Sequence, residues 1–258
     1  MSDERYWAGR VARFGHTGWS DAGVYAYDQQ LRLRALASLL DGLPTPAGAA
    51  ALDFGCGVGD FCALLARRGH RVVGHDLSPA VLARAAQHTA GAPIHYEADL
   101  DRVLAPPLAP YGLLLCVTVL QHVVDDAALA ALLKRLAAAL QTGGRLVVLE
   151  TFAAAGAPAS AYLKRRSMAA LVAACADAGL NLQQQRGFYH PSESPTKVYT
   201  AYRRRPAVRV LSRLAGWRLP GAVRALRSLA TRAAAQDGDF MDHAGSPTQW
   251  LVFERRAA

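Results

Sequence analysis

Three glycines at alternate positions, with a carboxylate on either side, make up the stretch of this sequence that is best suited to bind a ligand. The glycines are Gly55, Gly57 and Gly59. A glycine loop lets a ligand approach the backbone because no Cβ stands in the way, and its residues can adopt positive φ. Asp53 precedes the loop and Asp60 follows it. Two such carboxylates would repel a pyrophosphate, so the stretch favours a ligand with a cationic ammonium or sulfonium group.

Two more acidic residues stand where later strands are expected to end. Asp76 closes the apolar run 71–75, seventeen residues beyond Gly59, and Asp99 follows the run 93–98. A carboxylate at the end of a strand can accept hydrogen bonds from both hydroxyls of a ribose. An isolated Asp in this place is more commonly a helix cap or a turn residue. The two acids therefore indicate a nucleoside site only in combination with the glycine loop.

These features together resemble the motifs of the class I S-adenosylmethionine (SAM) dependent methyltransferases. The first motif of that family, acidic-x-Gly-x-Gly-x-Gly, matches 53–59, and the phrase Asp76-Leu77-Ser78-Pro79 is similar to its second motif. The resemblance implies that SAM is the cofactor and that S-adenosylhomocysteine is the product.

The resemblance also implies a role for each motif residue. Asp53 and the glycine loop would hold the methionine end, Asp76 the ribose, and Asp99 with the Leu100 backbone the adenine. The backbone around Val117 would face the reactive end. The implied cofactor-binding residues are Asp53, Gly55, Cys56, Gly57, Gly59, Asp76, Leu77, Asp99, Leu100 and Val117.

The exit of the fourth predicted strand, 118–123, carries the catalytic candidate. Strand ends line the ligand crevice of a parallel sheet, so this exit is expected to face the transferred methyl group. His122 is the candidate general base, because imidazole titrates near neutral pH. A structural histidine, hydrogen-bonded under the sheet edge, is the competing interpretation. The family commonly has Glu where this chain has Gln121, so no carboxylate base is predicted there, and no metal site is predicted.

Apolar runs and helical periods alternate along the chain and indicate the fold. The predicted strands are 50–53, 71–76, 93–100, 111–117, 145–150, 181–188 and 249–255. The predicted helices are 24–40, 61–68, 78–89, 125–140 and 167–178, with Gly143-Gly144 ending the helix 125–140. In the family that the motifs resemble, this order builds a doubly wound, Rossmann-like α/β fold. Its seven-stranded sheet is mostly parallel, with the last strand antiparallel beside the fifth.

Two segments outside this pattern are predicted to cover the acceptor. Residues 1–44 form an N-terminal lid with a helix, and 45–258 form the SAM-binding methyltransferase domain. Within that domain, 189–247 is a basic helical insert between the last two strands, where a minimal family member has a short hairpin. The candidate substrate-binding residues are Tyr6, His16, Trp19, Tyr25, Gln121 and Tyr189. The alternative for the N-terminal aromatic residues is that they pack a helix onto the sheet.

The formal charge of +9 is concentrated in one segment. Nine arginines and no acidic residue lie between Arg203 and Arg232, which indicates a local anionic partner. Three interpretations stay open: solvated arginines on a cover or acceptor lid, an anionic membrane surface or lipid-like acceptor, and nucleic acid or a protein partner.

The rest of the composition limits the possible fold class and cellular location of the protein. With 258 residues, of which 52% are hydrophobic, the chain can bury one substantial core. Its four cysteines lack metal-ligand spacing and are expected to be buried thiols. No apolar run reaches the roughly 20 residues of a membrane span. The first residues lack the pattern of a secretion signal, so a cytoplasmic protein is expected.

These observations favour transfer of a methyl group to a hydroxyl or amine of a small molecule, such as a sugar or another secondary metabolite. An aromatic lid and a long insert suit the enclosed pocket that such an acceptor needs. The alternatives are a membrane-associated lipid or quinone acceptor, a nucleic-acid acceptor, and a SAM-binding protein without turnover. A dinucleotide oxidoreductase comes last, because its pyrophosphate does not suit this loop.

Overall fold

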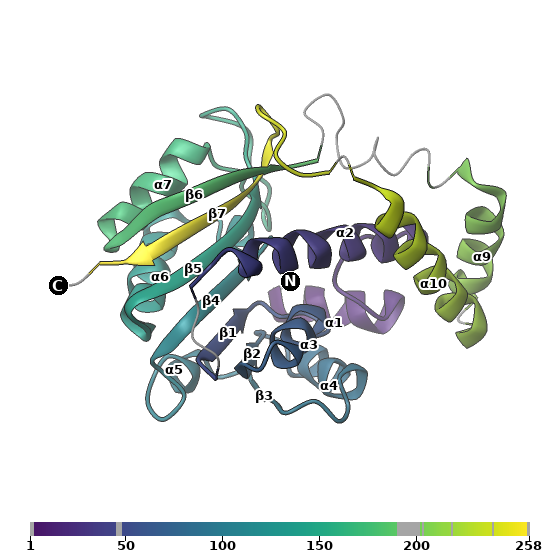
Figure 1. Cartoon of the computed structure of the whole chain (residues 1–258), viewed down its shortest axis with the longest axis horizontal. Coiled ribbons are helices and arrows are strands. Elements are labelled where there is room, and N and C mark those ends of the chain that lie inside the picture. Colours follow the sequence, from purple (N-terminus) through teal and green to yellow (C-terminus); the bar gives the residue numbers. More distant parts are fainter. Residues whose placement is uncertain are drawn as a thin grey trace. The chain divides into compact units, whose positions relative to one another are not determined.

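The chain folds into two compact units. The structure is a computed structural model that describes residues 3–44, 48–189, 202, 204–217, 219–238 and 240–256 (Figure 1). The first unit takes in Met1–Gly9, Pro44–Arg186 and Pro247–Ala258, and the second takes in Arg10–Leu43 and Gly187–Ser246. The boundary differs from the predicted division, because most of the predicted lid joins the predicted insert in one unit. The residues up to Gly9 belong with the sheet.

A seven-stranded sheet forms the first unit, in the order β3-β2-β1-β4-β5-β7-β6. The strands are β1 (Ala50–Phe54), β2 (Arg71–His75), β3 (Ile94–Glu97), β4 (Tyr111–Val117), β5 (Leu140–Thr151), β6 (Leu180–Phe188) and β7 (Thr248–Arg255). The pairs β1–β2, β2–β3, β1–β4 and β4–β5 are parallel, whereas β7 runs antiparallel beside β5. The predicted mostly parallel sheet with an antiparallel last strand is therefore confirmed.

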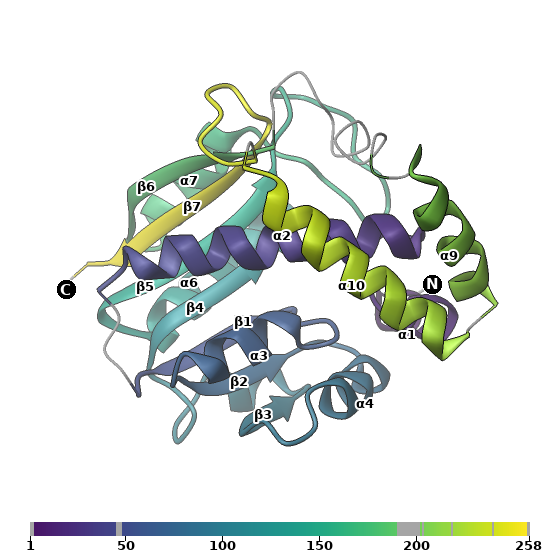
Figure 2. The same ribbon diagram turned by 45° about the vertical axis from the view of Figure 1, so that its right-hand side comes forward.

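Helices cover both faces of this sheet (Figures 1 and 2). They are α3 (Asp60–Arg67), α4 (Pro79–His88), α5 (Leu100–Val103), α6 (Asp126–Ala139) and α7 (Met168–Asp177). Because side chains alternate along a strand, Leu52, Leu114 and Val148 point to one face. There they pack in one core cluster with Leu133 of α6 and Cys175 of α7. The four cysteines are all free and buried, as expected from the sequence.

One local prediction was wrong. Gly143-Gly144 does not end a helix, since α6 ends at Ala139 and the backbone is already extended at Leu140. The glycines lie inside β5, where the pairing with β4 shifts register after Tyr111 and Gly143 has a φ of 73°. The chain also has an unpredicted helix, α1 (Asp3–Phe14).

Three helices pack together in the second unit. They are α2 (Ala22–Asp41), α9 (Pro206–Gly216) and α10 (Pro220–Gln236), and α10 contacts both of the others (Figure 2). Asp28 of α2 is only 2% exposed. It accepts a hydrogen bond from Trp19 at 2.7 Å, forms an ion pair with Arg32 at 3.0 Å, and accepts another hydrogen bond from Tyr189. These bonds join α2 to Trp19 and to Tyr189.

The predicted helical insert is therefore present as α9 and α10. Part of that prediction, residues 190–201 and the side chains of Arg203 and Arg218, lies outside the described residues. Among the helices of the described ranges, none combines the length and the hydrophobicity that crossing a bilayer requires.

Candidate functional site

The glycine loop connects β1 to α3 and has the conformation that its sequence indicates. Gly55, Gly57 and Gly59 have φ values of 75°, 53° and 84°, which favour glycine. The loop is also sterically closed to side chains. A Cβ at Gly55 would lie 2.4 Å from Val119, and one at Gly59 would lie 2.4 Å from the Tyr96 hydroxyl.

Backbone hydrogen bonds hold the loop against the end of β2. The amides of Gly55 and Cys56 both donate to the carbonyl oxygen of His75, at 2.7 and 2.8 Å. The amide of Gly57 donates to the Asp76 carboxylate at 3.2 Å, and the amide of Ser78 donates to the same carboxylate at 3.1 Å. Asp76 therefore fixes both the loop and the turn that leads into α4.

Two buried carboxylates lie at this sheet edge. Asp53 is 1% exposed and Asp76 is 8% exposed. Burial raises the pKa of Asp53 to about 7, although a hydrogen bond from the Cys62 thiol at 3.2 Å opposes the shift. Burial likewise raises the pKa of Asp76 to about 6. A cationic group placed beside them would stabilise their charged forms.

The third predicted contact, Asp99, lies where β3 leads into α5. Its carboxylate accepts hydrogen bonds from the amides of Asp101 and Arg102, at 2.9 and 3.4 Å, and so caps α5. The side chain is half exposed. Leu100 is partly buried in the core, while Leu77, which follows Asp76, is 45% exposed. Asp99 thus fills the ordinary role of a helix cap, and an adenine contact stays a prediction.

The β4 exit turns sharply and is held by an acid that the sequence reasoning did not select. Val117 ends β4, and Thr118 has a φ of 55°, a strained value for a residue that is not glycine. The short helix η1 (Leu120–His122) follows. Glu150, at the end of β5, is 4% exposed and accepts hydrogen bonds from the amides of Leu120 and Gln121, at 2.7 and 3.3 Å. The sequence signal for Glu150 is its position directly after the apolar run 146–149, where a strand is expected to end.

His122 lies on η1 among aromatic residues of the same unit. Its Nδ1 is 2.7 Å from the carbonyl oxygen of Tyr162. Trp7 of α1 contacts the imidazole edge to face, with 4.9 Å between ring centroids. Tyr6 stacks on the Tyr162 ring at 5.3 Å. The structure therefore brings the predicted residues Tyr6, Gln121 and His122 to one strand exit.

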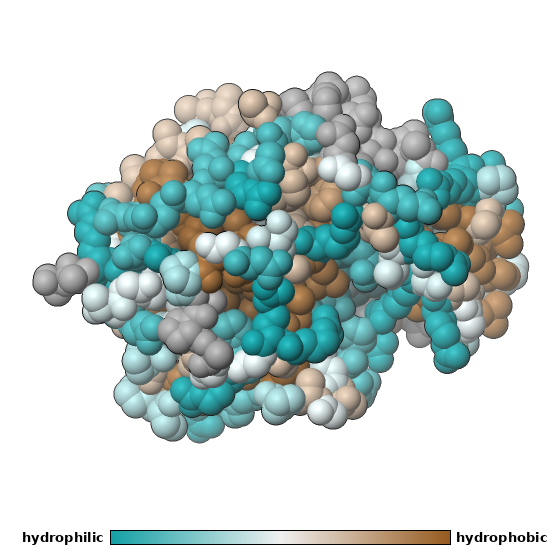
Figure 3. Space-filling model, in the orientation of Figure 1, coloured by the Kyte–Doolittle hydropathy of each residue, from teal (hydrophilic) through white to brown (hydrophobic). Residues whose placement is uncertain are grey.

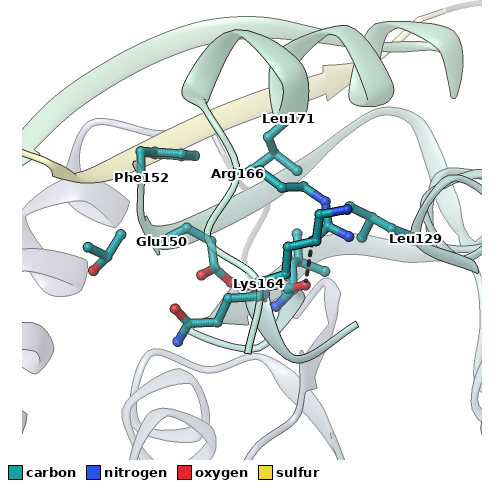
Figure 4. Close-up of a pocket in the computed structure, with 9 residues that line it drawn as sticks. Leu129, Glu150, Phe152, Lys164, Arg166 and Leu171 are labelled. Atoms are coloured by element: carbon teal, nitrogen blue, oxygen red, sulfur yellow. Dashed lines mark hydrogen bonds between the residues drawn. The ribbon is translucent and has the colours of Figure 1, made fainter. Parts of the chain in front are cut away.

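A small pocket adjoins this exit (Figure 4). Glu150 and Phe152 line it from β5 and its end, and Lys164 and Arg166 line it from the segment before α7. Both cations pair with the carboxylate of Asp126, Lys164 at 2.7 Å and Arg166 at 2.8 Å. Arg166 also donates to the carbonyl oxygen of Val123 at 2.7 Å. It therefore fixes the loop that carries His122.

The other predicted acceptor residues lie in the second unit. His16 stacks on Tyr25 with 3.5 Å between ring centroids. Tyr189 and Trp19 both bond to Asp28. His16, Tyr25 and Tyr189 are at most 9% exposed. Their contacts agree with packing of the helices, and a role in acceptor binding stays a prediction.

A family model described as a methyltransferase domain matches residues 25–193. The chain belongs to the SAM-dependent methyltransferases. Family membership makes SAM the cofactor of this fold, and the residues at the loop fit it. Its cationic methionine end suits the buried carboxylate of Asp53, and its ribose hydroxyls suit that of Asp76.

Several known methyltransferases resemble this one over part of its length. It is 36% identical over 105 residues to a ubiquinone biosynthesis O-methyltransferase of Xylella fastidiosa, covering 40% of this chain and 42% of the relative. It is also 36% identical over 130 residues to a trans-aconitate 2-methyltransferase of Methylobacterium nodulans, covering 50% of this chain and 48% of the relative. The matched segment thus spans less than half of either relative.

The fold also matches solved methyltransferase structures. The magnesium protoporphyrin IX methyltransferase of Synechocystis, crystallised with bound SAM, superposes with a TM-score of 0.53 at 20% identity. The match covers 72% of this chain and 89% of that one. At this identity the likeness supports the fold alone.

Proposed function

We propose that this methyltransferase transfers a methyl group from SAM to a hydroxyl oxygen of a small molecule, with His122 as the general base. The supporting observation is the contact between His122 Nδ1 and the Tyr162 carbonyl oxygen at 2.7 Å. A carbonyl oxygen can only accept, so Nδ1 carries the proton and the neutral ring has its lone pair on Nε2. The contact holds His122 in the tautomer that a base needs.

The surrounding residues position this base. Glu150 binds two amides of η1, and Arg166 binds the loop that follows it. Trp7 and Tyr6, on α1, add aromatic surface beside the imidazole and Tyr162. An acceptor that lies against these rings would be oriented and shielded from water, and its hydroxyl proton would pass to Nε2.

The loop residues would hold the cofactor at the neighbouring strand ends. Asp53 would meet its cationic methionine end and Asp76 its ribose hydroxyls. Bound SAM supplies a methyl group on a sulfonium, which is already a good leaving group. Alignment and proton removal are therefore the tasks left to the protein.

The relatives support an oxygen acceptor. One is named an O-methyltransferase of ubiquinone biosynthesis. For this chain we propose a hydroxyl of a sugar, a quinone-like phenol or another secondary metabolite, and an amine as the less favoured acceptor, because an unprotonated amine needs no base.

A carboxylate acceptor is the second candidate. Lys164 and Arg166 line the pocket, and a second relative is named for trans-aconitate, which is a carboxylate. Two facts weigh against it. Both cations already pair with Asp126, and a carboxylate is ionised at neutral pH and gives a base nothing to remove.

Substitution of His122 separates the two candidates. His122→Asn retains a donor for the Tyr162 carbonyl oxygen but cannot act as a base. We expect turnover of hydroxyl acceptors to fall about 100-fold or more, with SAM affinity unchanged. His95→Asn, at an exposed histidine on β3, is the matched control and should leave turnover unchanged. The assay follows methyl transfer from labelled SAM to panels of phenols, sugars, amines and carboxylates.

Two other outcomes of this assay would indicate a different function. Methylation of carboxylates alone, with equal turnover in His122→Asn, would establish the second candidate. SAM binding without product from any panel would indicate a SAM-binding protein without turnover.

A further inference from the structure

An apolar surface is exposed at the tip where α9 meets α10. Val210 is 58% exposed, Trp217 75%, Leu219 47% and Val223 38%. These four make up most of the large hydrophobic residues that are exposed in the described part of the chain. Figure 3 shows apolar residues gathered over α9. We call this set of four residues the α9–α10 tip.

The helical period explains why the tip faces outward. Val210 and Trp217, the residue that caps the C-terminus of α9, are seven residues apart, two turns of a helix, so they lie on the same side of α9. Val208 lies on the opposite face and is 2% exposed, and that face contacts the helices of its own unit. Packing α9 into the unit therefore leaves Val210 and Trp217 uncovered. Leu219 and Val223 extend the same surface across the turn into α10.

Arginines surround the tip. Arg209 and Arg213 lie on α9, and Arg224 and Arg227 lie on α10, all exposed. No acidic residue occurs between 203 and 232. Asp21 lies beside α9, but the arginines outnumber it, and their excess positive charge produces a local potential that attracts an anionic surface.

We propose that the α9–α10 tip docks on the surface of a bilayer that contains anionic phospholipid. An exposed tryptophan with aliphatic neighbours enters the boundary between headgroups and acyl chains, while flanking arginines bind lipid phosphates. Insertion and charge attraction together give firmer membrane binding than either alone. The tip lies in the second unit, whereas the cofactor loop lies in the first. Docking therefore does not depend on the proposed acceptor chemistry.

The chemistry of the tip favours lipid over the other anionic or apolar partners. Nucleic acid would bind the arginines but would leave Val210 and Leu219 without a role. A second copy of the tip would bring like charges together and would be repelled. An anionic bilayer satisfies both the apolar and the cationic residues.

Vesicle co-sedimentation tests the proposal on the full chain. We expect the protein to pellet with vesicles of phosphatidylcholine and phosphatidylglycerol, and not with phosphatidylcholine alone. Bound fraction should fall as salt rises. Trp217→Ser with Leu219→Ser should weaken binding at least tenfold, and these substitutions touch only exposed side chains. The matched control is Leu182→Ser, at a leucine of β6 that is 36% exposed.

A charge series tests the arginines. Arg209→Gln with Arg213→Gln should weaken vesicle binding, whereas Arg71→Gln with Arg84→Gln, at exposed positions in the first unit, removes the same charge and should not. Failure of the unaltered protein to bind anionic vesicles at low salt would overturn the proposal. So would equal binding by the Trp217→Ser, Leu219→Ser variant, or binding to duplex DNA with no binding to vesicles.

Discussion

At the scale of single residues, two carboxylates determine the chemistry of the cofactor site. Asp53 and Asp76 are buried at the ends of neighbouring parallel strands. Their surroundings supply a thiol and two amides, which satisfy hydrogen bonds but provide no full positive charge. A cationic ligand beside them would supply that charge, which is the physical reason why an acidic glycine loop suits SAM better than a dinucleotide.

The raised pKa values predict that SAM binding depends on pH. Burial raises the pKa of Asp53 from its ordinary value of 3.8 to about 7, and that of Asp76 to about 6. Below pH 5 both groups are neutral and attract a sulfonium weakly, so affinity for SAM should rise between pH 5 and 7.5 and then level off. In the ligand-free protein the same raised pKa values act on stability, which should decrease with pH where the affinity for SAM increases. Because the folded-state pKa exceeds the unfolded value, the free energy of unfolding should fall as pH rises from about 4 to 7.

Titrations of SAM at several pH values, with thermal melts of the ligand-free protein in the same buffers, measure both effects. Asp53→Asn should remove much of the pH dependence of affinity and of stability. An affinity for SAM that is constant across this range would contradict the assignment of Asp53 as a partner of the cationic group.

The functional role of a residue could be predicted from the sequence only where the residue belongs to a motif. The glycine loop and Asp76 stand in a pattern of fixed spacing, and the structure places them together at one sheet edge. Tyr162 and Trp7 have no such pattern. Their roles arise from contacts such as that between His122 and Tyr162, forty residues apart in the chain, which depend on the folded path of an irregular segment.

At the scale of elements, the β1–α3 turn tolerates little change. Gly59 begins α3 with a φ of 84°, and Gly69 follows the same helix with the same φ of 84°. A Cβ at Gly59 would meet the Tyr96 hydroxyl at 2.4 Å, whereas a Cβ at Gly69 would meet nothing within 4 Å. Comparing Gly59 with Gly69 therefore distinguishes the cost of backbone strain from the cost of a steric conflict with Tyr96.

We predict that Gly59→Ala destabilises the protein more than Gly69→Ala. Both substitutions force alanine into positive φ, at a cost of about 1–2 kcal/mol, and Gly59→Ala adds the conflict with Tyr96. Chemical denaturation measures the difference, and Gly59→Ala with Tyr96→Phe should recover part of it. Equal loss of stability in the two single variants would show that Tyr96 does not confine the loop.

The limits of a strand or helix were predicted accurately where clear sequence signals flank it. Strand β4 was predicted with its observed limits, Tyr111–Val117, because a continuous apolar run lies between a proline-rich segment and a polar exit. The start of β5 was missed because Gly143-Gly144 is typical of a helix end, while the register shift against β4 accommodates both glycines within the strand. Helix α1 was not predicted, although Trp7, Val11 and Phe14 recur at helical spacing, because this period is short and most of the other positions are polar or charged.

At the scale of the whole molecule, the chain separates a cofactor-binding unit from a helical unit that carries most of its excess positive charge. The sheet order and the antiparallel β7 were predictable, since the motifs indicated the family and the family has one topology. The second unit was not predictable as a unit. Its helices come from distant parts of the sequence, and contacts such as the hydrogen bonds from Arg34 of α2 to the carbonyl oxygens of Ala234 and Asp237 join them.

The central claim is that the loop and its two carboxylates bind SAM, and calorimetric titration tests it most directly. We predict that the protein binds SAM and S-adenosylhomocysteine at one site and does not bind NADH. Asp76→Ala should weaken SAM binding about 10- to 100-fold, through loss of charge-assisted hydrogen bonds, and Asp177→Ala, at an exposed aspartate of α7, should leave it unchanged. Binding of NADH in place of SAM, or unchanged SAM affinity in Asp76→Ala, would contradict the account.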